Sequence, residues 1–400
     1  MISAGKYNRE ERGYVDIQDH ALIGNMRTAA LISIDGSVES YCVPHFDSPS
    51  VFARILDKDK GGHFSVKPTI DHSSKQAYLP SSNVLATKFL ADEGVAQVTD
   101  FLPRQTNTGA AAGKPLLFWL IRRVEVIRGR VPIRMECCPA FDYARAAHET
   151  QFKPDDSQPP NTTHEKVVFR SRDLTLDLRY VVDTAPDLDI SKPEIKLRPL
   201  DLRDKGHKGV GIITDFELVE GQIVTFILRT APEDGKEHTK PTKEQAEALG
   251  LPLEVLIQGA SKLRAKDDPI LTPGLVNGLL HDTTAFWQGW ISKSTYRGSW
   301  REAVHRSALA LKLLIFEPTG AIVASPTFSL PEFIGGTRNW DYRFSWIRDS
   351  SFTLYALIRL GFTDEANAYM DFIFRRLQQR NPDGSLNIMQ VRCPGRLPSR

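Results

Sequence analysis

The chain has 400 residues, of which 41% are hydrophobic and 25% are charged, and its formal net charge at pH 7 is +2. This length allows two or three domains with sizeable cores, and the composition is that of an ordinary soluble globular protein. So small a net charge gives no electrostatic reason to expect nucleic acid or an acidic membrane as a partner.

The N-terminal sequence and the cysteines bear on the cellular compartment. The first residues, MISAGKYNREERGYVD, are charged and have no apolar stretch like that of a secretory signal. No run approaches the roughly 18 apolar residues needed to span a bilayer. The cysteines form neither a zinc-ligand pattern nor an obvious disulfide framework and are expected to be small buried residues; they are Cys42, Cys137, Cys138 and Cys393. These features predict a reduced, cytoplasmic protein.

After a polar N-terminal segment, residues 1–18, the chain has the patterns of a β-domain over residues 19–240. Asp35-Gly36 separates two apolar stretches, which is typical of a β-hairpin. Similar pairs of stretches recur at 85–102 and 216–228. Strict alternation, which predicts one inward and one outward face, occurs at Leu174, Leu176, Leu178 and Tyr180. Many short alternating strands separated by turns predict an antiparallel β-sandwich.

Beyond residue 240 the patterns are helical. Residues 241–272 are predicted to form a helical linker, and after Pro273 the apolar period changes from two to 3.6. A helix over 299–316 is expected to be buried on most sides, and another over 352–360 is expected to end at Gly361. A further helix after Thr363 has a predicted inner stripe of Ala366, Tyr369, Met370, Ile373 and Leu377. Alternating buried and half-buried helices fit a barrel of paired helices.

The segment 329–360 combines aromatic rings with charges. Its rings are Trp340, Tyr342, Phe344 and Trp346, and its charges include Arg338, Asp341, Arg343, Arg348 and Asp349. Such a mixture suits neither a core, which would desolvate the charges, nor an ordinary surface, which would expose the rings. It suits a sugar site, where rings cover the C–H face of a pyranose and charged groups bond its hydroxyls. The alternative is an ordinary loop that is anchored by its rings. The next helix is expected to begin near Asp349 or Ser350, both of which are good N-cap residues.

Three short motifs in this segment, SLPE, GG-x-RNWDYR and W-x-RD, resemble glycoside hydrolase family 15, the glucoamylase and trehalase group. The block IGNMRTAALISIDGSVESYCVPHFDSPSVFARILD resembles the trehalase-like domain that precedes the catalytic domain in this group. The resemblance implies a β-sandwich followed by the first part of an (α/α)6 toroid, the six-hairpin glycosidase fold, over residues 273–390. It also implies inverting hydrolysis of α-glucosidic bonds, without a cofactor, with an α-glucoside or trehalose as substrate.

The resemblance assigns substrate-binding residues. Arg348 and Asp349 match the pair that holds hydroxyls of the non-reducing glucose, and Tyr342 and Trp346 match its aromatic wall. Trp340 and Arg338 are expected at the rim of this subsite or as structural residues beside it. Asp349 is assigned to binding because an interacting Arg348 would keep it ionised, unlike a catalytic acid.

No catalytic residue is assigned. Inverting hydrolysis needs two carboxylates roughly 6.5–9.5 Å apart, and in the family both are glutamates whose positions would lie beyond Arg400. Only about four barrel helices are expected, and residues 391–400, VRCPGRLPSR, do not follow the family pattern. The sequence therefore predicts a truncated or mis-spliced product with little or no turnover.

Other functions were weighed against this one. The chain has no HExxH, Walker, GxGxxG or GxSxG motif, so no metal or cofactor is expected. A non-catalytic sugar-binding or interaction protein that keeps the first glucose subsite is one alternative, and a β-sandwich partner module is another. His45 and Asp47 are expected to be turn or interface residues, with a position at the barrel mouth as the alternative. The choice between trehalose and maltooligosaccharides stays open, as does the oligomeric state.

Overall fold

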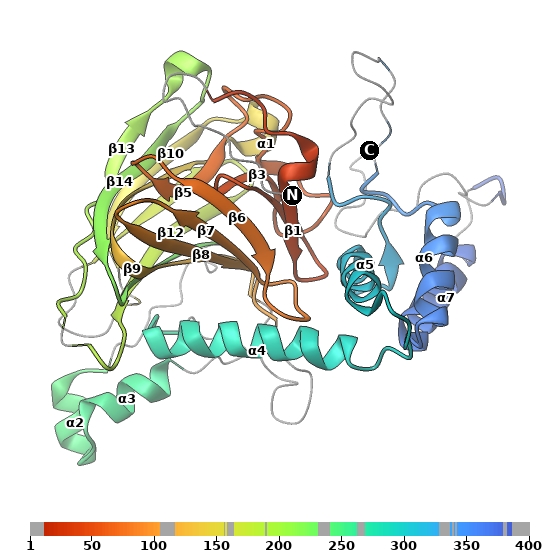
Figure 1. The fold of residues 1–400 in the computed structure, drawn as a ribbon. Coiled ribbons are helices and arrows are strands. Elements are labelled where there is room, and N and C mark those ends of the chain that lie inside the picture. Colours follow the sequence, from red (N-terminus) through yellow and green to blue (C-terminus); the bar gives the residue numbers. More distant parts are fainter. Residues whose placement is uncertain are drawn as a thin grey trace.

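A computed structural model describes residues 12–104, 117–155, 157, 164–188, 190–230, 241–261, 269–327, 337, 340, 342–378 and 382–385. It contains a two-layered antiparallel β-sandwich with helices along one edge and one side (Figure 1). The prediction of a sheet-rich N-terminal part followed by a helical region is confirmed.

The first layer, sheet A, has the strand order β1-β2-β3-β5-β9-β14-β13, and β4 pairs with one end of β3. Its strands are β1 (His20–Gly24), β2 (Ala29–Ser33), β3 (Ser37–Cys42), β4 (Ser50–Phe52), β5 (His63–Pro68), β9 (Trp119–Cys138), β13 (Arg198–Asp201) and β14 (Val210–Val219). The hairpin expected at Asp35-Gly36 is present as β2 and β3, and Gly36 has the positive φ of 79° that such a turn needs.

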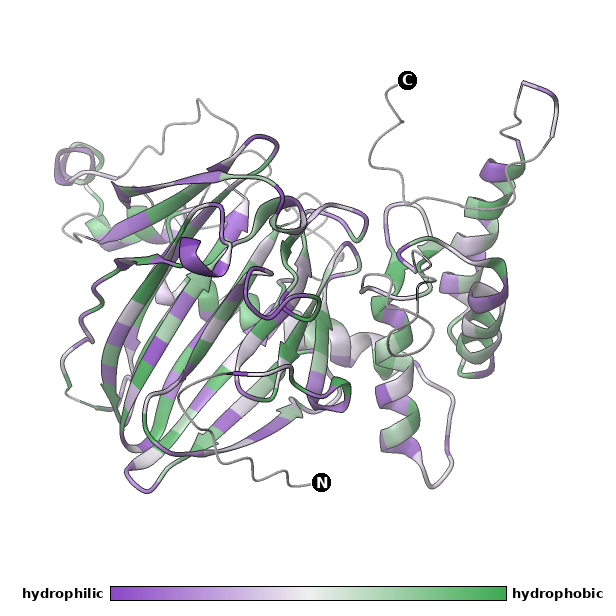
Figure 2. Cartoon of the chain, turned by 90° about the horizontal axis from the view of Figure 1, so that it is seen from above, coloured by the Kyte–Doolittle hydropathy of each residue, from purple (hydrophilic) through white to green (hydrophobic). Residues whose placement is uncertain are grey.

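The second layer, sheet B, has the order β6-β7-β8-β9-β15-β12-β11-β10. Its remaining strands are β6 (Ser73–Tyr78), β7 (Leu85–Leu90), β8 (Gly94–Phe101), β10 (His148–Pro154), β11 (Glu165–Ser171), β12 (Thr175–Thr184) and β15 (Gln222–Thr230). Hydrophilic and hydrophobic residues alternate along many of these strands (Figure 2).

Strand β9 joins the two layers. Its first half pairs with β8 and β15 in sheet B, and its second half pairs with β5 and β14 in sheet A. Between the halves, Gly129 has φ 73°, and a Cβ there would lie 2.2 Å from the carbonyl oxygen of Glu93. Only glycine fits this crossing.

The alternation in β12 was read incorrectly as one inward and one outward face. Both faces of this strand are buried, including Asp177 and Arg179. Arg179 donates hydrogen bonds to Asp155 at 2.6 Å and to Asp177 at 3.1 Å, and Arg229 donates to Asp177 at 2.8 Å. These charges are tolerated in the interior because each has an ionic partner there.

The α-helices in the described residues are α1 (Phe141–Ala144), α2 (Lys243–Leu249), α3 (Leu253–Ala260), α4 (Pro273–Ile291), α5 (Arg301–Leu313), α6 (Ile347–Arg359) and α7 (Thr363–Leu377). The described part of the predicted linker contains two short helices, α2 and α3, and Gly250 at φ 62° ends α2. The last strand of the sheets ends at Thr230. The domain limits at residues 240 and 272 stay predictions.

Three helix predictions need correction. Helix α5 ends at Leu313, and the apolar run continues as β16 (Ile315–Phe316), which pairs with β17 (Ala321–Ile322). Helix α6 begins at Ile347 rather than near Asp349. In α7, Met370 and Leu377 of the predicted inner stripe are exposed, because only the side that faces α6 and β17 is packed.

The sandwich and the helices share apolar cores. One cluster combines Met26, Ala29 and Phe46 of the sandwich with buried residues of α4 to α7, and another combines Phe101 and Trp119 with residues at the start of α4. The two parts therefore pack as one body in the described chain.

An ion pair crosses the same contact. Arg104, almost fully buried, donates to both carboxylate oxygens of Glu317 at 2.6 and 2.8 Å and to the carbonyl of Asn25 at 3.2 Å. The Thr283 hydroxyl of α4 accepts from the Arg104 backbone N–H at 2.9 Å, and the Phe286 ring lies 4.5 Å from the guanidinium. The Arg104 side chain thus connects three separate parts of the chain.

Cys42, Cys137 and Cys138 are buried, as predicted, and burial raises the pKa of Cys138 well above its usual value. Cys393 lies outside the described residues. Within the described ranges, none of the helices has the length and apolarity that crossing a bilayer requires.

Candidate functional site

The predicted sugar-binding segment lies between β17 and α6. The backbone N–H of Ala324 donates to the carbonyl of Phe344 at 3.0 Å, and that of Ser325 donates to the carbonyl of Tyr342 at 2.7 Å. These bonds fix one side of the segment against the chain that follows β17. The segment then enters α6 directly, with Trp346 at the N-cap position.

Three of the predicted aromatic residues lie together. The Trp346 ring has its centroid 6.1 Å from that of Trp340, edge to face, and 6.0 Å from that of Tyr342. Trp346 is half-buried, whereas Trp340 is 44% exposed. The Nε1 of Trp346 is buried and has no hydrogen-bond partner among the described residues.

Arg348 and Asp349 occupy the first turn of α6. The Arg348 Nη2 lies 3.1 Å from the Asp349 Oδ2, and the Arg348 guanidinium is 5.8 Å from the centre of the Trp346 ring. A carboxylate in the first turn of a helix is stabilised by the helix dipole. The Arg348 side chain is 70% exposed and that of Asp349 37%, so both groups can exchange water for ligand hydroxyls at little cost.

The structure therefore brings five of the six predicted binding residues together. They form what we call the Trp340–Asp349 cluster, which consists of Trp340, Tyr342, Trp346, Arg348 and Asp349. The sixth, Arg338, lies outside the described residues, as do Asp341 and the glutamate of SLPE, Glu332. That the cluster binds sugar stays a prediction.

A contact that the sequence did not reveal joins this segment to the sandwich. Arg343 donates through Nη1 to the Tyr143 hydroxyl in α1 and to the carbonyl of Ser48 at 3.4 Å. Its guanidinium also lies 5.7 Å from the centre of the Tyr143 ring. Residues 143 and 343 are 200 positions apart, so no local pattern could have paired them.

Tyr143 is held in an unusual backbone conformation. Asp142, Tyr143 and Ala144 have φ values of 49°, 57° and 61°, so three consecutive residues other than glycine are left-handed. Such residues cost roughly 1–2 kcal/mol each, or about 3–6 kcal/mol for this turn. Strain of this kind persists only where the surrounding structure determines it, and it is found most often at functional sites.

His45 contributes to the contact between the sandwich and the helical part. Its ring lies edge-on to Phe118 at 5.9 Å and to Phe316 at 5.4 Å. Burial lowers the pKa of His45, although Asp47 opposes the shift. This environment favours the interface role for His45.

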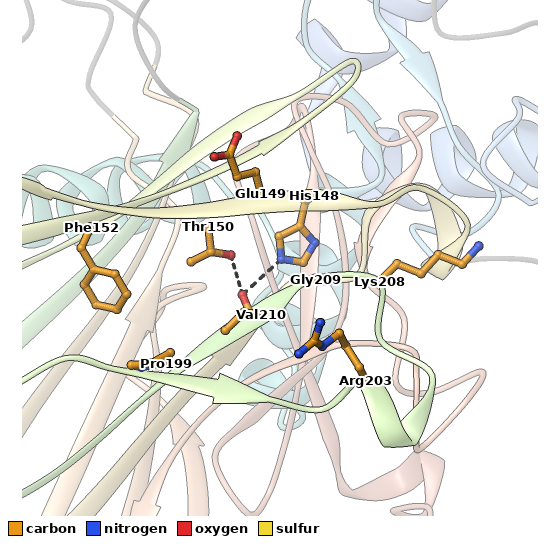
Figure 3. Close-up of a pocket in the computed structure, with 9 residues that line it drawn as sticks. All are labelled: His148, Glu149, Thr150, Phe152, Pro199, Arg203, Lys208, Gly209 and Val210. Carbon is orange, nitrogen blue, oxygen red and sulfur yellow. Dashed lines mark hydrogen bonds between the residues drawn. The ribbon is translucent and has the colours of Figure 1, made fainter.

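Two cavities lie elsewhere on the molecule. One, of about 460 Å³, lies between β10 and the β13–β14 hairpin, where His148 and Thr150 both donate to the carbonyl of Val210 and Phe152 lies towards the other end (Figure 3). The other, of about 800 Å³, is lined by β12, the stretch 192–197 and the start of α4. Neither includes a residue of the Trp340–Asp349 cluster. In the described part of the chain, histidine, cysteine and acidic residues form no group of three or more that could hold a metal ion.

A sheet-rich domain followed by helices, with rings and an ion pair at the start of α6, is consistent with a β plus α glycosidase fold. Comparison with known families agrees with it. Residues 298–392 match the model of glycosyl hydrolases family 15, and residues 11–186 match the trehalase-like N-terminal model. The predicted resemblance to glycosyl hydrolases family 15 and to the trehalase-like N-terminal domain is thus confirmed.

Several curated proteins are similar to most of the chain. A trehalase from Thermoplasma volcanium is 32% identical over 371 residues, covering 91% of this chain and 48% of that protein. A trehalase from Mycolicibacterium smegmatis is 33% identical over 371 residues, covering 89% and 47%. The chain spans about half the length of these relatives. Among solved structures, a family GH92 alpha-mannosidase from Bacteroides thetaiotaomicron is 12% identical and covers 76% of this chain and 40% of its own. Its TM-score of 0.36 is too low to indicate a shared fold.

Proposed function

We propose that this protein is a trehalase-type glycoside hydrolase, and that the Trp340–Asp349 cluster binds the non-reducing glucose of trehalose. The observation that carries the proposal is the placement of Arg348 and Asp349 beside the Trp346 ring at the start of α6. The relatives at 32% and 33% identity are trehalases, which favours trehalose over maltooligosaccharides.

The chemistry of the cluster supports this substrate class. Aromatic rings cover the apolar face of a pyranose, while a few polar groups fix its orientation. Asp349 accepts hydrogen bonds from sugar hydroxyls, whereas Arg348 donates them. The exposure of the ion pair allows a hydroxyl to replace water without desolvating a buried charge. The sequence pattern of the cysteines, which forms no obvious disulfide framework, supports a reducing, cytoplasmic environment for this activity.

We further propose that the 400-residue chain alone turns over little substrate. Inversion at an acetal needs an acid and a base on opposite faces of the sugar, roughly 6.5–9.5 Å apart. Neither role falls on a residue of this chain by resemblance to family 15. Loss of general acid–base assistance costs roughly 10²- to 10⁴-fold in rate, so sugar binding is the activity to measure first.

Titration calorimetry of the purified chain with trehalose, maltose and glucose tests the proposal. Saturable binding of trehalose that Asp349→Ala abolishes is the expected result. Asp364→Ala is a matched control, because Asp364 lies exposed in the first turn of the neighbouring helix α7. Absence of sugar binding, or equal binding by Asp349→Ala, would contradict the assignment.

A parallel assay follows glucose release from trehalose, maltose and an aryl α-glucoside. Release at the level of the blank is expected for the 400-residue chain. Clear release above the blank would refute the proposal that this chain is inactive, while leaving the binding site in place.

A further inference from the structure

We propose that Tyr143, in the β-sandwich, is a positioning residue for the sugar-binding cluster and acts through Arg343. The proposal rests on the function proposed above, because it concerns the same cluster. It assigns to the N-terminal domain a role in sugar recognition through a side chain that does not itself belong to the cluster.

The argument begins with the placement of Arg343. It lies between Tyr342 and Phe344, whose carbonyls accept hydrogen bonds from the backbone after β17. Its own side chain donates to the Tyr143 hydroxyl and the Ser48 carbonyl of the sandwich. Residues 342–344 are therefore held from two sides, by the helical part and by the sandwich.

The guanidinium suits this task. Its donors lie in one rigid plane, so two acceptors and a ring fix both its position and its orientation. The Tyr143 hydroxyl and the Ser48 carbonyl both accept from Nη1, and the Tyr143 ring lies 5.7 Å from the guanidinium carbon. A lysine at this position would keep the positive charge but would lack the planar group that fixes the orientation of the donors.

The conformation of Tyr143 supports the same conclusion. The left-handed turn at residues 142–144 places an unfavourable backbone conformation at the position whose hydroxyl meets Arg343. Tyr143 also packs against the buried pair Cys42 and Ala53 of the sandwich, which anchors it. An anchored ring held in a strained turn is a rigid reference point for the segment.

The consequence for the sugar site follows from the chain path. The ring of Tyr342, one residue before Arg343, packs against that of Trp346. The Arg348 guanidinium in turn lies over the Trp346 ring. If Arg343 loses the Tyr143 hydroxyl, the longer bond to the Ser48 carbonyl at 3.4 Å is the remaining described hydrogen bond from its side chain to the sandwich, and the residues on either side of it are held less firmly. The rings and the ion pair then sample more positions, and a smaller fraction of the chains has the arrangement that binds sugar. The apparent affinity for sugar falls by the same factor.

The test uses Tyr143→Phe in the full 400-residue chain, a change that removes the hydroxyl and keeps the ring. Calorimetry with trehalose is expected to show a Kd raised by about two- to thirtyfold, the range usual for residues that modulate a site without touching the ligand. Arg343→Lys is expected to weaken binding similarly. The double variant is expected to lose little more than either single one, because both changes break the same contact.

Arg145→Gln is the matched control. The Arg145 guanidinium lies 5.2 Å from the same ring, but it takes no part in the two hydrogen bonds described for Arg343. Its trehalose affinity is expected to equal that of the parent chain. If Tyr143 only stabilised the sandwich, Tyr143→Phe would lower the thermal midpoint and leave the Kd unchanged.

Hydrogen exchange of peptides that contain residues 342–346 provides a readout without sugar. Faster exchange there in Tyr143→Phe, and not in Arg145→Gln, is expected. Trehalose binding that needs Asp349 but is unaffected by Tyr143→Phe would overturn this inference and leave the proposed function standing. If no sugar binds at all, the proposed function fails, and unchanged exchange in Tyr143→Phe would overturn the positioning role separately.

Discussion

The contact between the sandwich and the helical part gives a quantitative prediction at Glu317. The substitution Glu317→Gln removes a negative charge that faces two guanidinium groups, Arg104 and Arg27. Burial alone would raise the pKa of Glu317. The hydrogen bonds and charge of Arg104, with a smaller contribution from Arg27, outweigh burial and hold this pKa below its usual value. The variant leaves both cations without their shared counter-charge.

The magnitude follows from the burial of the pair. Removing one partner of a buried ion pair costs about 3–5 kcal/mol. The Glu317 side chain is 32% exposed, whereas that of Arg104 is 3% exposed, so solvent screens part of the loss and about 2 kcal/mol is expected. With a urea slope of roughly 3 kcal/mol per molar for a chain of this size, the unfolding midpoint falls by about 0.7 M.

Urea unfolding followed by helical circular dichroism at pH 7 measures the effect. Glu217→Gln is the control, because Glu217 forms an equally short but solvent-exposed pair with Arg130, and less than 1 kcal/mol is expected there. A carboxyl with a lowered pKa stabilises the fold above its unfolded pKa and loses this contribution as the pH falls. The difference between parent and Glu317→Gln must therefore shrink at acidic pH. A difference that persists unchanged at pH 3 would refute the ionic explanation.

Two further predictions concern the sandwich. Burial lowers the pKa of His63 to about 4, although a hydrogen bond to Glu136 opposes the shift. Between pH 6.5 and 4 the unfolded chain therefore binds more protons than the folded one. The free energy of unfolding falls by up to about 3 kcal/mol as the pH drops through this window. His63→Gln should flatten the slope of unfolding free energy against pH, and an unchanged slope would exclude His63 as its source. Gly129→Ala is expected to destabilise the fold by at least about 1–2 kcal/mol because of its left-handed φ and the clash with Glu93. As a control in α3, a Cβ at Gly259 would meet no atom within 4 Å, so Gly259→Ala should be neutral or stabilising in the same urea unfolding experiment.

Local patterns predicted the sandwich well because its hairpins are encoded by neighbouring residues. The turn at Asp35-Gly36 needs a positive φ, and the sequence has glycine at that position. The burial of Asp177 and Arg179 was missed because their compensation comes from Asp155 and Arg229, which are distant in sequence. A period of two shows that neighbouring residues face opposite sides, but it does not show what covers each side.

The helical part was predicted less accurately at its ends. The run that includes Ile315 and Phe316 is apolar, and a short apolar run is compatible with a helix or a strand. Its pairing with Ala321 and Ile322 depends on the tight turn between them, where Gly320 has φ 83°. Residues 340–349 were recognised from composition and resemblance, but their attachment to the sandwich through Arg343 depends on tertiary contacts alone.

The shared cores argue against the sandwich as an independent partner module, and this yields a last prediction. Phe101 and Trp119 are buried against Leu271, Val276 and Leu279 at the start of the helical region. Removing the chain after residue 270 would expose these rings, at roughly 1.5–3 kcal/mol for each large apolar side chain. Limited proteolysis under native conditions is therefore expected to leave no stable product that ends near residue 270. A fragment of residues 1–270 that accumulates and unfolds cooperatively would show that the sandwich folds without the helices, and would overturn this account of the contact.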